Sequence, residues 1–246
     1  MISDLYFYLT AIPAVLIYAI GKGGFGGALG VIAVPLMSLT APPSEAASVL
    51  LPILCVMDFF AVRYHYRACL YDEIKRMLPF ALVGVVGASL VMTVMPERVV
   101  ELFVGGLSIA FCAQYYLVGD PKSCGRVLGS FWSTLSGFSS TMIHAGGAPI
   151  NMYLLPKNYA KEPFVATMAV FFAILNLIKL IPYTVTGQFD DQTLLTSLVL
   201  IPLAPIGVKL GVRLLSVCNQ QQVYRICYFL LLLSGAKLFY SGLFPA

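Results

Sequence analysis

The chain has 246 residues, of which 59% are hydrophobic and only 11% are charged, with a mean hydropathy of +0.89 and a formal net charge of +4. Soluble domains carry about 25% charged residues, so the composition excludes a water-soluble protein and predicts an all-α polytopic membrane protein. The basic residues are scattered at the ends of apolar runs and form no patch, which argues against a nucleic-acid partner.

Eight apolar runs follow one another along the chain, separated by charged or turn residues. They cover roughly residues 5–40, 44–62, 77–95, 99–118, 127–156, 162–186, 192–215 and 222–243. One membrane crossing takes about 20 residues, so the first and fifth runs are too long for one plain crossing, and both contain glycine breaks. Each can be one long tilted helix or a hairpin of two shorter helices.

The charge distribution favours hairpins that return to the side they entered. The basic residues between the runs then share one side of the membrane, as the positive-inside rule requires. They are Arg63, Arg67, Lys75, Arg76, Lys122, Arg126, Lys157, Lys161, Arg213 and Arg225. The other side receives Asp4, the Glu97-Arg98 turn and the Asp190-Asp191 turn. Both termini are therefore expected outside.

The break in the first run, residues 21–30, reads GKGGFGGALG, with a lysine that has no acid nearby in sequence. Glycine is costly inside a helix, and a membrane tolerates broken backbone only where protein or a cavity satisfies it. At a hairpin tip, the free N–H groups and the dipole of the second helix favour an anion. The predicted anion-binding residues of this tip are Lys22, Gly23, Gly24, Phe25, Gly26 and Gly27. The alternative is that Lys22 reaches a lipid headgroup and the glycines only pack helices.

The second run contains Asp58 in an apolar setting, LCVMDFF. A buried carboxylate there would couple proton movement to transport. The alternative is an interfacial acid paired with Arg63 or with a neighbouring helix.

The break in the fifth run, residues 139–151, reads SSTMIHAGGAPIN and is rich in hydroxyl groups. His144 is expected to donate to an oxyanion or to take up a proton near neutral pH, unless it is simply a packing residue. Gly146, Gly147 and Asn151 complete the predicted second half of the binding site. In the sixth run, Asn176 is a further predicted site residue.

Lys179 lies one turn after Asn176, so the two side chains are expected to face the same cavity. Because Lys179 precedes Pro182 near the outer end of its run, snorkelling toward the lipid headgroups is the alternative.

An internal repeat is suggested by an offset of 118 residues, which sets residues 26–30 against 144–148 and Asp58 against Asn176. The offset predicts two transmembrane repeats of four segments each, residues 1–119 and 120–246. With a hairpin opening each unit, the repeats are inverted, as in many secondary transporters. The two glycine-rich tips are then expected to meet near the midplane and form the substrate site.

The six cysteines show no paired spacing and are read as packing residues. The sequence has no phosphate-loop pattern, no zinc-ligand spacing and no nucleophile elbow. Neither an enzyme, nor a cofactor, nor a metal site is therefore expected.

The first break running into Val34-Pro35-Leu36, the second break with Gly146-Gly147, and the four-plus-four plan resemble the TauE/SafE family of sulfite-exporter-like permeases. The resemblance implies a bacterial or archaeal inner-membrane carrier for small sulfur-containing anions such as sulfite or organosulfonates, coupled to an ion gradient. The sequence departs from the family pattern at two places that bear on the particular substrate. The usual triple-glycine run is diluted to Ala28-Leu29-Gly30 and to Gly146-Gly147-Ala148, and Tyr153 stands where the first half has Pro35.

The leading hypothesis is a secondary anion exporter in which Lys22 balances the anion's charge and Asp58 or His144 carries a coupled proton. The alternatives are a non-transporting membrane scaffold and a passive anion channel. The lipid bilayer and a small anion are the expected partners, and a homodimer is left open.

Overall fold

The computed structural model describes residues 5–27, 33–37, 39–92, 94–118 and 125–244. The regular structure within these ranges is helical, as predicted. The α-helices are α1 (Leu5–Gly24), α2 (Ala33–Met37), α3 (Pro43–His65), α4 (Tyr71–Val91), α5 (Glu97–Val118), α6 (Arg126–Ile143), α7 (Gly147–Leu154), α8 (Lys161–Val185), α9 (Asp191–Leu200), α10 (Leu203–Val217) and α11 (Gln220–Leu243). Two short 3₁₀ turns, η2 (Tyr66–Ala68) and η3 (Leu155–Lys157), follow α3 and α7.

Within the described ranges, five helices are long and apolar enough to cross a membrane, and a sixth span results if α9 and α10 are taken together. The chain is therefore a multi-pass membrane protein. The α9–α10 pair corresponds to the predicted run 192–215 and is bent by 45°. Pro202 stands at the bend, where its missing N–H removes a helical hydrogen bond.

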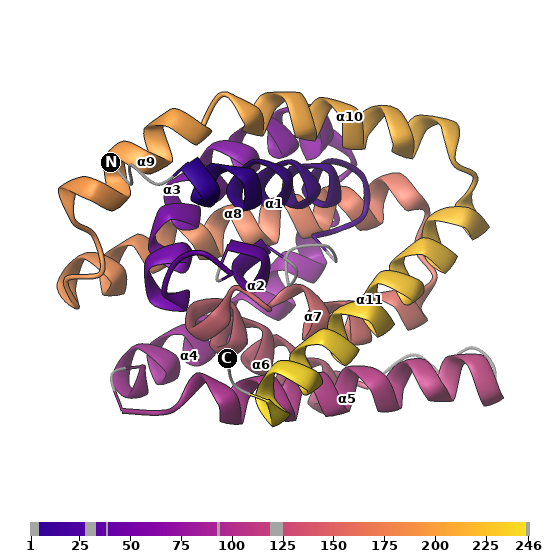
Figure 1. The fold of residues 1–246 in the computed structure, drawn as a ribbon. Helices are drawn as coiled ribbons and strands as arrows, with labels where there is room; N and C mark the ends of the chain where they lie inside the picture. Colours follow the sequence, from indigo (N-terminus) through magenta and orange to yellow (C-terminus); the bar gives the residue numbers. More distant parts are fainter. Residues whose placement is uncertain (1–4, 28–32, 38, 93, 119–124, 245–246) are drawn as a thin grey trace.

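The helices pack in pairs: α1 on α10, α4 on α6, α3 on α8, and α5 on α11. Figure 1 shows α9 and α10 along one face of the molecule, with α4, α5 and α6 along the other and α11 crossing between them. One apolar cluster lies mainly among α1, α2, α3 and the α9–α10 pair. A second lies mainly among α4, α5, α6, α7, α8 and α11. The α3–α8 pair lies between the two clusters.

The α1–α10 and α4–α6 pairs approach closely because glycines face the partner backbone. A Cβ atom at Gly84 on α4 would overlap the carbonyl oxygen of Thr134 on α6, and one at Gly137 on α6 would overlap that of Ala81. Gly23 and Gly24 on α1 face the α10 backbone in the same way. Small residues at helix crossings are typical of membrane proteins, where backbones must pack closely.

The first long run reverses direction, as the hairpin interpretation predicts. Near the start of α1, the Thr10 hydroxyl lies 2.8 Å from that of Thr40, shortly before α3 begins. At the other end of α1, the Gly23 carbonyl oxygen lies 2.9 Å from Nε2 of His65, the last residue of α3. The first contact joins the starts of α1 and α3 and the second joins their ends, so the two helices run in the same direction. The chain between them must therefore return to the end of the bundle where α1 starts.

The second long run also reverses. Gly129 lies near the start of α6, and a Cβ atom there would lie 3.0 Å from Cζ of Tyr153, near the end of α7. The short helix α7 therefore brings the chain back to the end of the bundle from which α6 departs.

The two ends of the bundle differ in charge. We call one of them the basic end; it carries the residues after α3, the start of α4, the segment from η3 to the start of α8, and the α10–α11 turn. The start of α1 and the end of α11 lie at the opposite end, where Arg98 Nε donates to the Gly242 carbonyl at 2.7 Å.

Candidate functional site

An ion pair joins Lys22 in the last turn of α1 to Asp58 in α3. Lys22 is 5% exposed and Asp58 is 1% exposed. The second carboxylate oxygen of Asp58 accepts a hydrogen bond of 2.6 Å from Nδ2 of Asn176 on α8. Pairing of Asp58 with Arg63 is thus wrong, whereas pairing with a neighbouring helix is correct. Three helices converge on this one carboxylate.

The Lys22 ammonium points into the protein, so the snorkelling alternative for this lysine is wrong. Its Nζ lies 5.7 Å from the ring centre of Tyr18 and 5.6 Å from that of Phe172. These distances permit cation–π attraction. Both rings also shield the ion pair from water.

A second buried cluster surrounds Lys179, which is 0% exposed and does not snorkel. Its Nζ donates to the Ser140 carbonyl at 2.9 Å and to the Ser140 hydroxyl at 3.0 Å, and it lies 3.1 Å from Nδ1 of His144. An ammonium can only donate, so Nδ1 of His144 must accept. The His144 proton is then assigned to Nε2, which lies 3.2 Å from the Ala47 carbonyl.

The turn residues of both hairpins have left-handed backbone conformations. Gly26 and Gly27 have φ values of 57° and 72°, and His144 has a φ of 52°. This region suits glycine, and it is uncommon for a residue with a side chain. His144 is held there by its contacts with Ala47 and Lys179.

The predicted tip glycines divide into two kinds. Gly23 and Gly24 are packing residues against α10, whereas Gly26 and Gly27 make the turn. Phe25, between the two pairs, is buried at 5% exposure. The remaining part of the run, residues 28–30, lies outside the described residues.

The second tip offers few free backbone donors. The N–H groups of Ala148 and Ile150 donate to Ala145 and Gly146 at 3.4 Å each, and Pro149 has no N–H. The Gly146 carbonyl accepts from the Ser136 hydroxyl at 2.7 Å. The tip therefore offers an anion at most the N–H groups of Gly146 and Gly147.

Tyr18 links described parts of the two tips, with its ring beside Lys22 and its hydroxyl 3.5 Å from the His144 carbonyl. That the two tips meet near the midplane stays a prediction, since residues 28–30 of the first tip lie outside the described residues. Asn176 and Lys179, one turn apart on α8, each serve one cluster. The site is thus two polar clusters connected by Tyr18 and α8.

A narrow space beside the ion pair has no room for a water molecule. Its walls are formed by Lys22, Gly26, Gly27, Asp58, Met168, Ala169 and Phe172. On this side of the ion pair the site is therefore closed in this conformation, and an anion must widen it to bind there.

Asn151, the remaining predicted site residue, is fully buried on α7. Neither its side-chain nitrogen nor its oxygen has a hydrogen-bond partner within the part of the chain that the structure describes. A buried amide without partners is unfavourable, so this position favours a bound water or ligand.

Sequence reasoning missed Tyr18, Phe172 and Tyr183 as site residues. Tyr183 contacts His144, with 3.3 Å between its hydroxyl and Nε2, and it donates to the Thr141 carbonyl at 3.1 Å. Both tyrosines lie four residues from a buried lysine, Tyr18 before Lys22 and Tyr183 after Lys179. That spacing places each tyrosine on the same helix face as its lysine. The sequence therefore contained a signal that could have identified both tyrosines as site residues.

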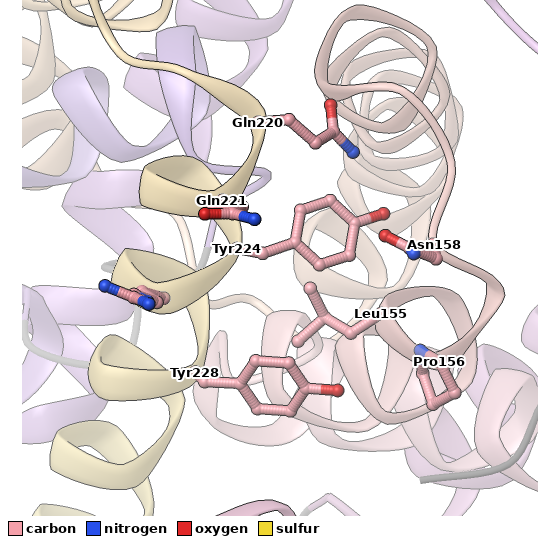
Figure 2. Close-up of a pocket in the computed structure, with 8 residues that line it drawn as sticks. Leu155, Pro156, Asn158, Gln220, Gln221, Tyr224 and Tyr228 are labelled. Atoms are coloured by element: carbon pink, nitrogen blue, oxygen red, sulfur yellow. The ribbon is translucent and has the colours of Figure 1, made fainter. Parts of the chain in front are cut away.

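A larger pocket, of about 370 Å³, opens at the basic end between η3 and the start of α11 (Figure 2). Leu155, Pro156 and Asn158 line one wall, and residues of α11 line the other. Tyr159 connects this pocket to Glu73, at the start of α4: its carbonyl accepts from Gln220 and Tyr224, and its hydroxyl donates to Glu73.

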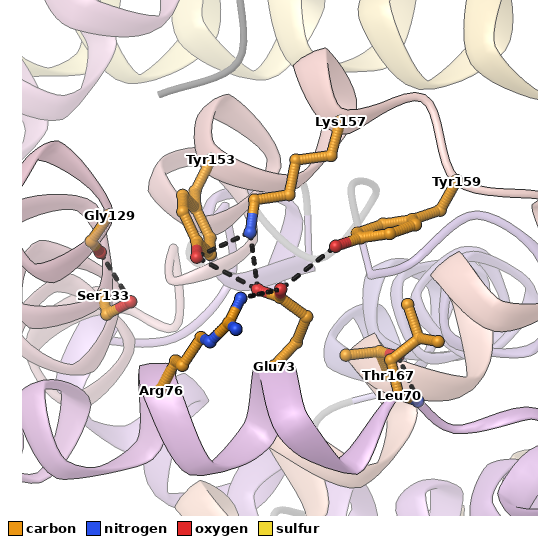
Figure 3. Close-up of polar contacts among 9 residues, drawn as sticks. All are labelled: Leu70, Glu73, Arg76, Gly129, Ser133, Tyr153, Lys157, Tyr159 and Thr167. Carbon is orange, nitrogen blue, oxygen red and sulfur yellow. Dashed lines mark hydrogen bonds and ion pairs between the residues drawn. The ribbon is translucent and has the colours of Figure 1, made fainter. Parts of the chain in front are cut away.

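Glu73 is 4% exposed and is the centre of a polar network (Figure 3). Its carboxylate accepts hydrogen bonds from Lys157 Nζ at 2.6 Å, Arg76 at 3.0 Å, and the hydroxyls of Tyr153 and Tyr159 at 3.0 Å each. Lys157 also donates to the Tyr153 hydroxyl at 2.7 Å. The network ties the returning limb of the second hairpin to α4. Sequence reasoning did not single out Glu73.

The Tyr159 hydroxyl is expected to contribute measurably to stability through this network. Burial, and then the hydrogen bond to Glu73, raise the pKa of Tyr159 above its usual value, so the hydroxyl stays a donor at neutral pH. Tyr159→Phe should lower the free energy of unfolding by about 1–2 kcal/mol. Tyr71→Phe, which removes an exposed hydroxyl 3.4 Å from the Tyr66 carbonyl, should change it by less than about 0.5 kcal/mol. Thermal unfolding in detergent measures both, and equal losses would contradict the role assigned to Tyr159.

Among the described residues, no group of three or more histidine, cysteine, aspartate or glutamate side chains could hold a metal ion. The described cysteines are free, and Cys124 lies outside the described residues. A family model described as "Sulfite exporter TauE/SafE" matches residues 11–238. No curated protein and no solved structure gives a match.

Proposed function

Because the chain belongs to the TauE/SafE sulfite exporter family, we propose that it is a secondary transporter that exports sulfite or a related sulfur-containing anion. Membership makes the protein a membrane transporter and not an enzyme, as the sequence predicted. For this transporter we also propose a binding site, a coupled proton and an arrangement of the two halves.

The observation that carries the proposal is the charge balance of the buried centre. Two lysines, Lys22 and Lys179, are buried there with one carboxylate, Asp58. With all three ionised, the centre has a formal charge of +1, and intramembrane charges are expensive unless paired. A small oxyanion between the two clusters would offset this charge and accept hydrogen bonds from both ammonium groups.

The ion pair suggests how a proton is coupled to the anion. In the closed site the Asp58 carboxylate is paired with the Lys22 ammonium group. An incoming anion must therefore compete with Asp58 for that group. Protonation of Asp58 removes that competition, so binding of the anion is linked to binding of a proton by Asp58. His144 is the second candidate for the proton, through its contact with Lys179.

We propose an architecture of two inverted repeats, residues 1–119 and 120–246, that move against each other during transport. Adding 118 to the bounds of α3 gives 161–183, close to α8 at Lys161–Val185. The same offset relates Gly26 to His144, which share a left-handed conformation. It also relates Asp58 to Asn176, which contact each other. The offset also relates α1 to α6 and α4 to α10. The α1–α10 pair in one arrangement therefore corresponds to the α6–α4 pair in the other, and both pairs are present.

For orientation, we propose that the basic end faces the cytoplasm of a bacterial or archaeal cell and that both termini lie outside. The support is the concentration of lysine and arginine at that end, with Lys157 and Lys161 in the connection between α7 and α8.

Uptake of [³⁵S]sulfite into proteoliposomes tests the function. We expect uptake that saturates and that is accelerated by unlabelled sulfite inside the vesicles. Lys179→Met should slow the initial rate by about tenfold or more, since a charge-assisted hydrogen bond is worth roughly 1.5–3 kcal/mol. Lys209→Met, at an exposed position on α10, is the matched control and should leave the rate unchanged.

The outcomes separate the three function classes. A carrier gives counterflow, whereas a passive channel gives uptake without stimulation from the far side. A scaffold gives no protein-dependent uptake of sulfite or of organosulfonates, although the protein elutes as a folded species. Either of the last two results overturns the proposal.

A further inference from the structure

The pocket at the basic end is polar and lies well apart from the ion pair. Its α11 wall carries Gln220, Gln221, Tyr224, Arg225 and Tyr228, and its other wall carries Asn158. In Figure 2 the Tyr224 hydroxyl points across the gap toward Asn158, and Tyr228 lies below it in the view with its hydroxyl on the side of Pro156. The pocket is open to solvent, in contrast to the closed space beside Lys22.

Two of these groups are fixed by hydrogen bonds that hold the walls together. Gln220 donates to the Tyr159 carbonyl at 2.6 Å and accepts from the Lys161 N–H at 2.7 Å. The Tyr224 hydroxyl also donates to the Tyr159 carbonyl, at 2.8 Å. The pocket is thus a built feature, bridged by Tyr159, which in turn donates to Glu73.

The electrostatics of the pocket favour an anion. Its lining residues include Arg225, Asn158 and Gln221, whose side chains can donate hydrogen bonds, and they include no aspartate or glutamate. It also lies beside the first two turns of α11, a 24-residue helix whose amino-terminal dipole is positive. Arginine and amide donors together suit a small planar or pyramidal oxyanion.

We propose that this pocket is a second anion site, in which Arg225, Gln221 and Asn158 collect small oxyanions from the solution at the basic end before transport. The proposal rests on the proposed function only for the identity of the anion, sulfite. Such a site raises the local concentration of substrate at the mouth of the protein and contributes to KM more than to kcat.

Equilibrium dialysis of [³⁵S]sulfite against purified protein in a neutral, lipid-free detergent tests the site, with sodium chloride holding ionic strength constant. Arg225→Gln and Gln221→Glu should each weaken sulfite binding at the pocket by about tenfold. Arg213→Gln removes the same charge from an exposed position at the same end of the molecule and should leave binding unchanged. The lipid-free detergent ensures that no phosphate headgroup supplies the signal.

A transport measurement separates this site from the central one. In proteoliposomes, Arg225→Gln should raise KM for sulfite presented at the basic end by about five- to tenfold and leave kcat unchanged. If wild-type vesicles carry no sulfite, the proposed function fails, and the binding comparison alone still decides the pocket. If Arg225→Gln and Arg213→Gln bind sulfite equally well, the pocket is not an anion site.

Discussion

Replacing Lys22 with methionine should lower the free energy of unfolding by about 3–5 kcal/mol, because it leaves the Asp58 carboxylate buried without its cation. Asp58 is 1% exposed, and Asn176 is the hydrogen-bond partner that remains for it among the described residues. The same substitution should abolish sulfite transport. Thermal unfolding in detergent and initial uptake rates in proteoliposomes measure the two effects. A Lys22→Met protein as stable as the wild type would contradict the buried ion pair.

A double variant separates the structural role of Lys22 from its role in transport. Lys22→Met with Asp58→Asn removes both charges and keeps an oxygen that can accept from Asn176. Replacing a buried pair with neutral groups is often close to neutral for stability, so this variant should unfold within about 1 kcal/mol of the wild type. We expect it to fold and to remain inactive. Transport at the wild-type rate would remove Lys22 and Asp58 from the proposed site.

Replacing Gly84 with alanine should destabilise the protein by about 3 kcal/mol, whereas the same change at Gly87 should be neutral or slightly stabilising. Both glycines lie on α4, one turn apart. A Cβ atom at Gly84 would overlap the Thr134 carbonyl and lie 2.7 Å from the Phe138 nitrogen, so α4 and α6 must separate. At Gly87 the nearest atom is a ring carbon of Phe138 at 3.9 Å, an ordinary contact.

The melting temperatures of the two alanine variants in one detergent check this expectation. Equal effects would mean that α4 and α6 do not cross at Gly84. A lower melting temperature for the Gly84 variant alone would place the crossing of α4 and α6 at that residue.

Composition and charge placement predicted the membrane class, the helical fold and the reversal of both long runs. The reversals could be predicted because loop charges report which side of a membrane a loop occupies. The family could also be predicted, from short glycine motifs that lie in the two breaks. The pairing of α1 with α10 and of α4 with α6 could not be predicted from the sequence, since the helices of each pair are not adjacent in the chain.

The glycines of the first break illustrate the limit of sequence reasoning. Gly23, Gly24, Gly26 and Gly27 form one continuous motif, but the first two face the α10 backbone and the last two have positive φ values. Only the position of α10 distinguishes the two kinds. A leucine at Gly24 would therefore disrupt helix packing whether the protein is a carrier or a scaffold.

The partners of the two buried lysines show the same limit. Nothing near Lys22 in sequence indicates Asp58, 36 residues away, and nothing near Lys179 indicates Ser140. Each lysine is conspicuous in the sequence because its charge lies within an apolar run. Whether each reaches a lipid headgroup or an internal partner depends on tertiary packing.

The closed space beside Lys22 and Asp58 has a consequence for a cell that maintains a proton gradient. Within the described residues, this space has no room for a water molecule and so offers no file of water along which protons can hop. With its own aspartate in place of substrate, the empty carrier is expected to pass few protons along this route. Energy stored across the membrane is then not dissipated while the carrier waits for its next anion.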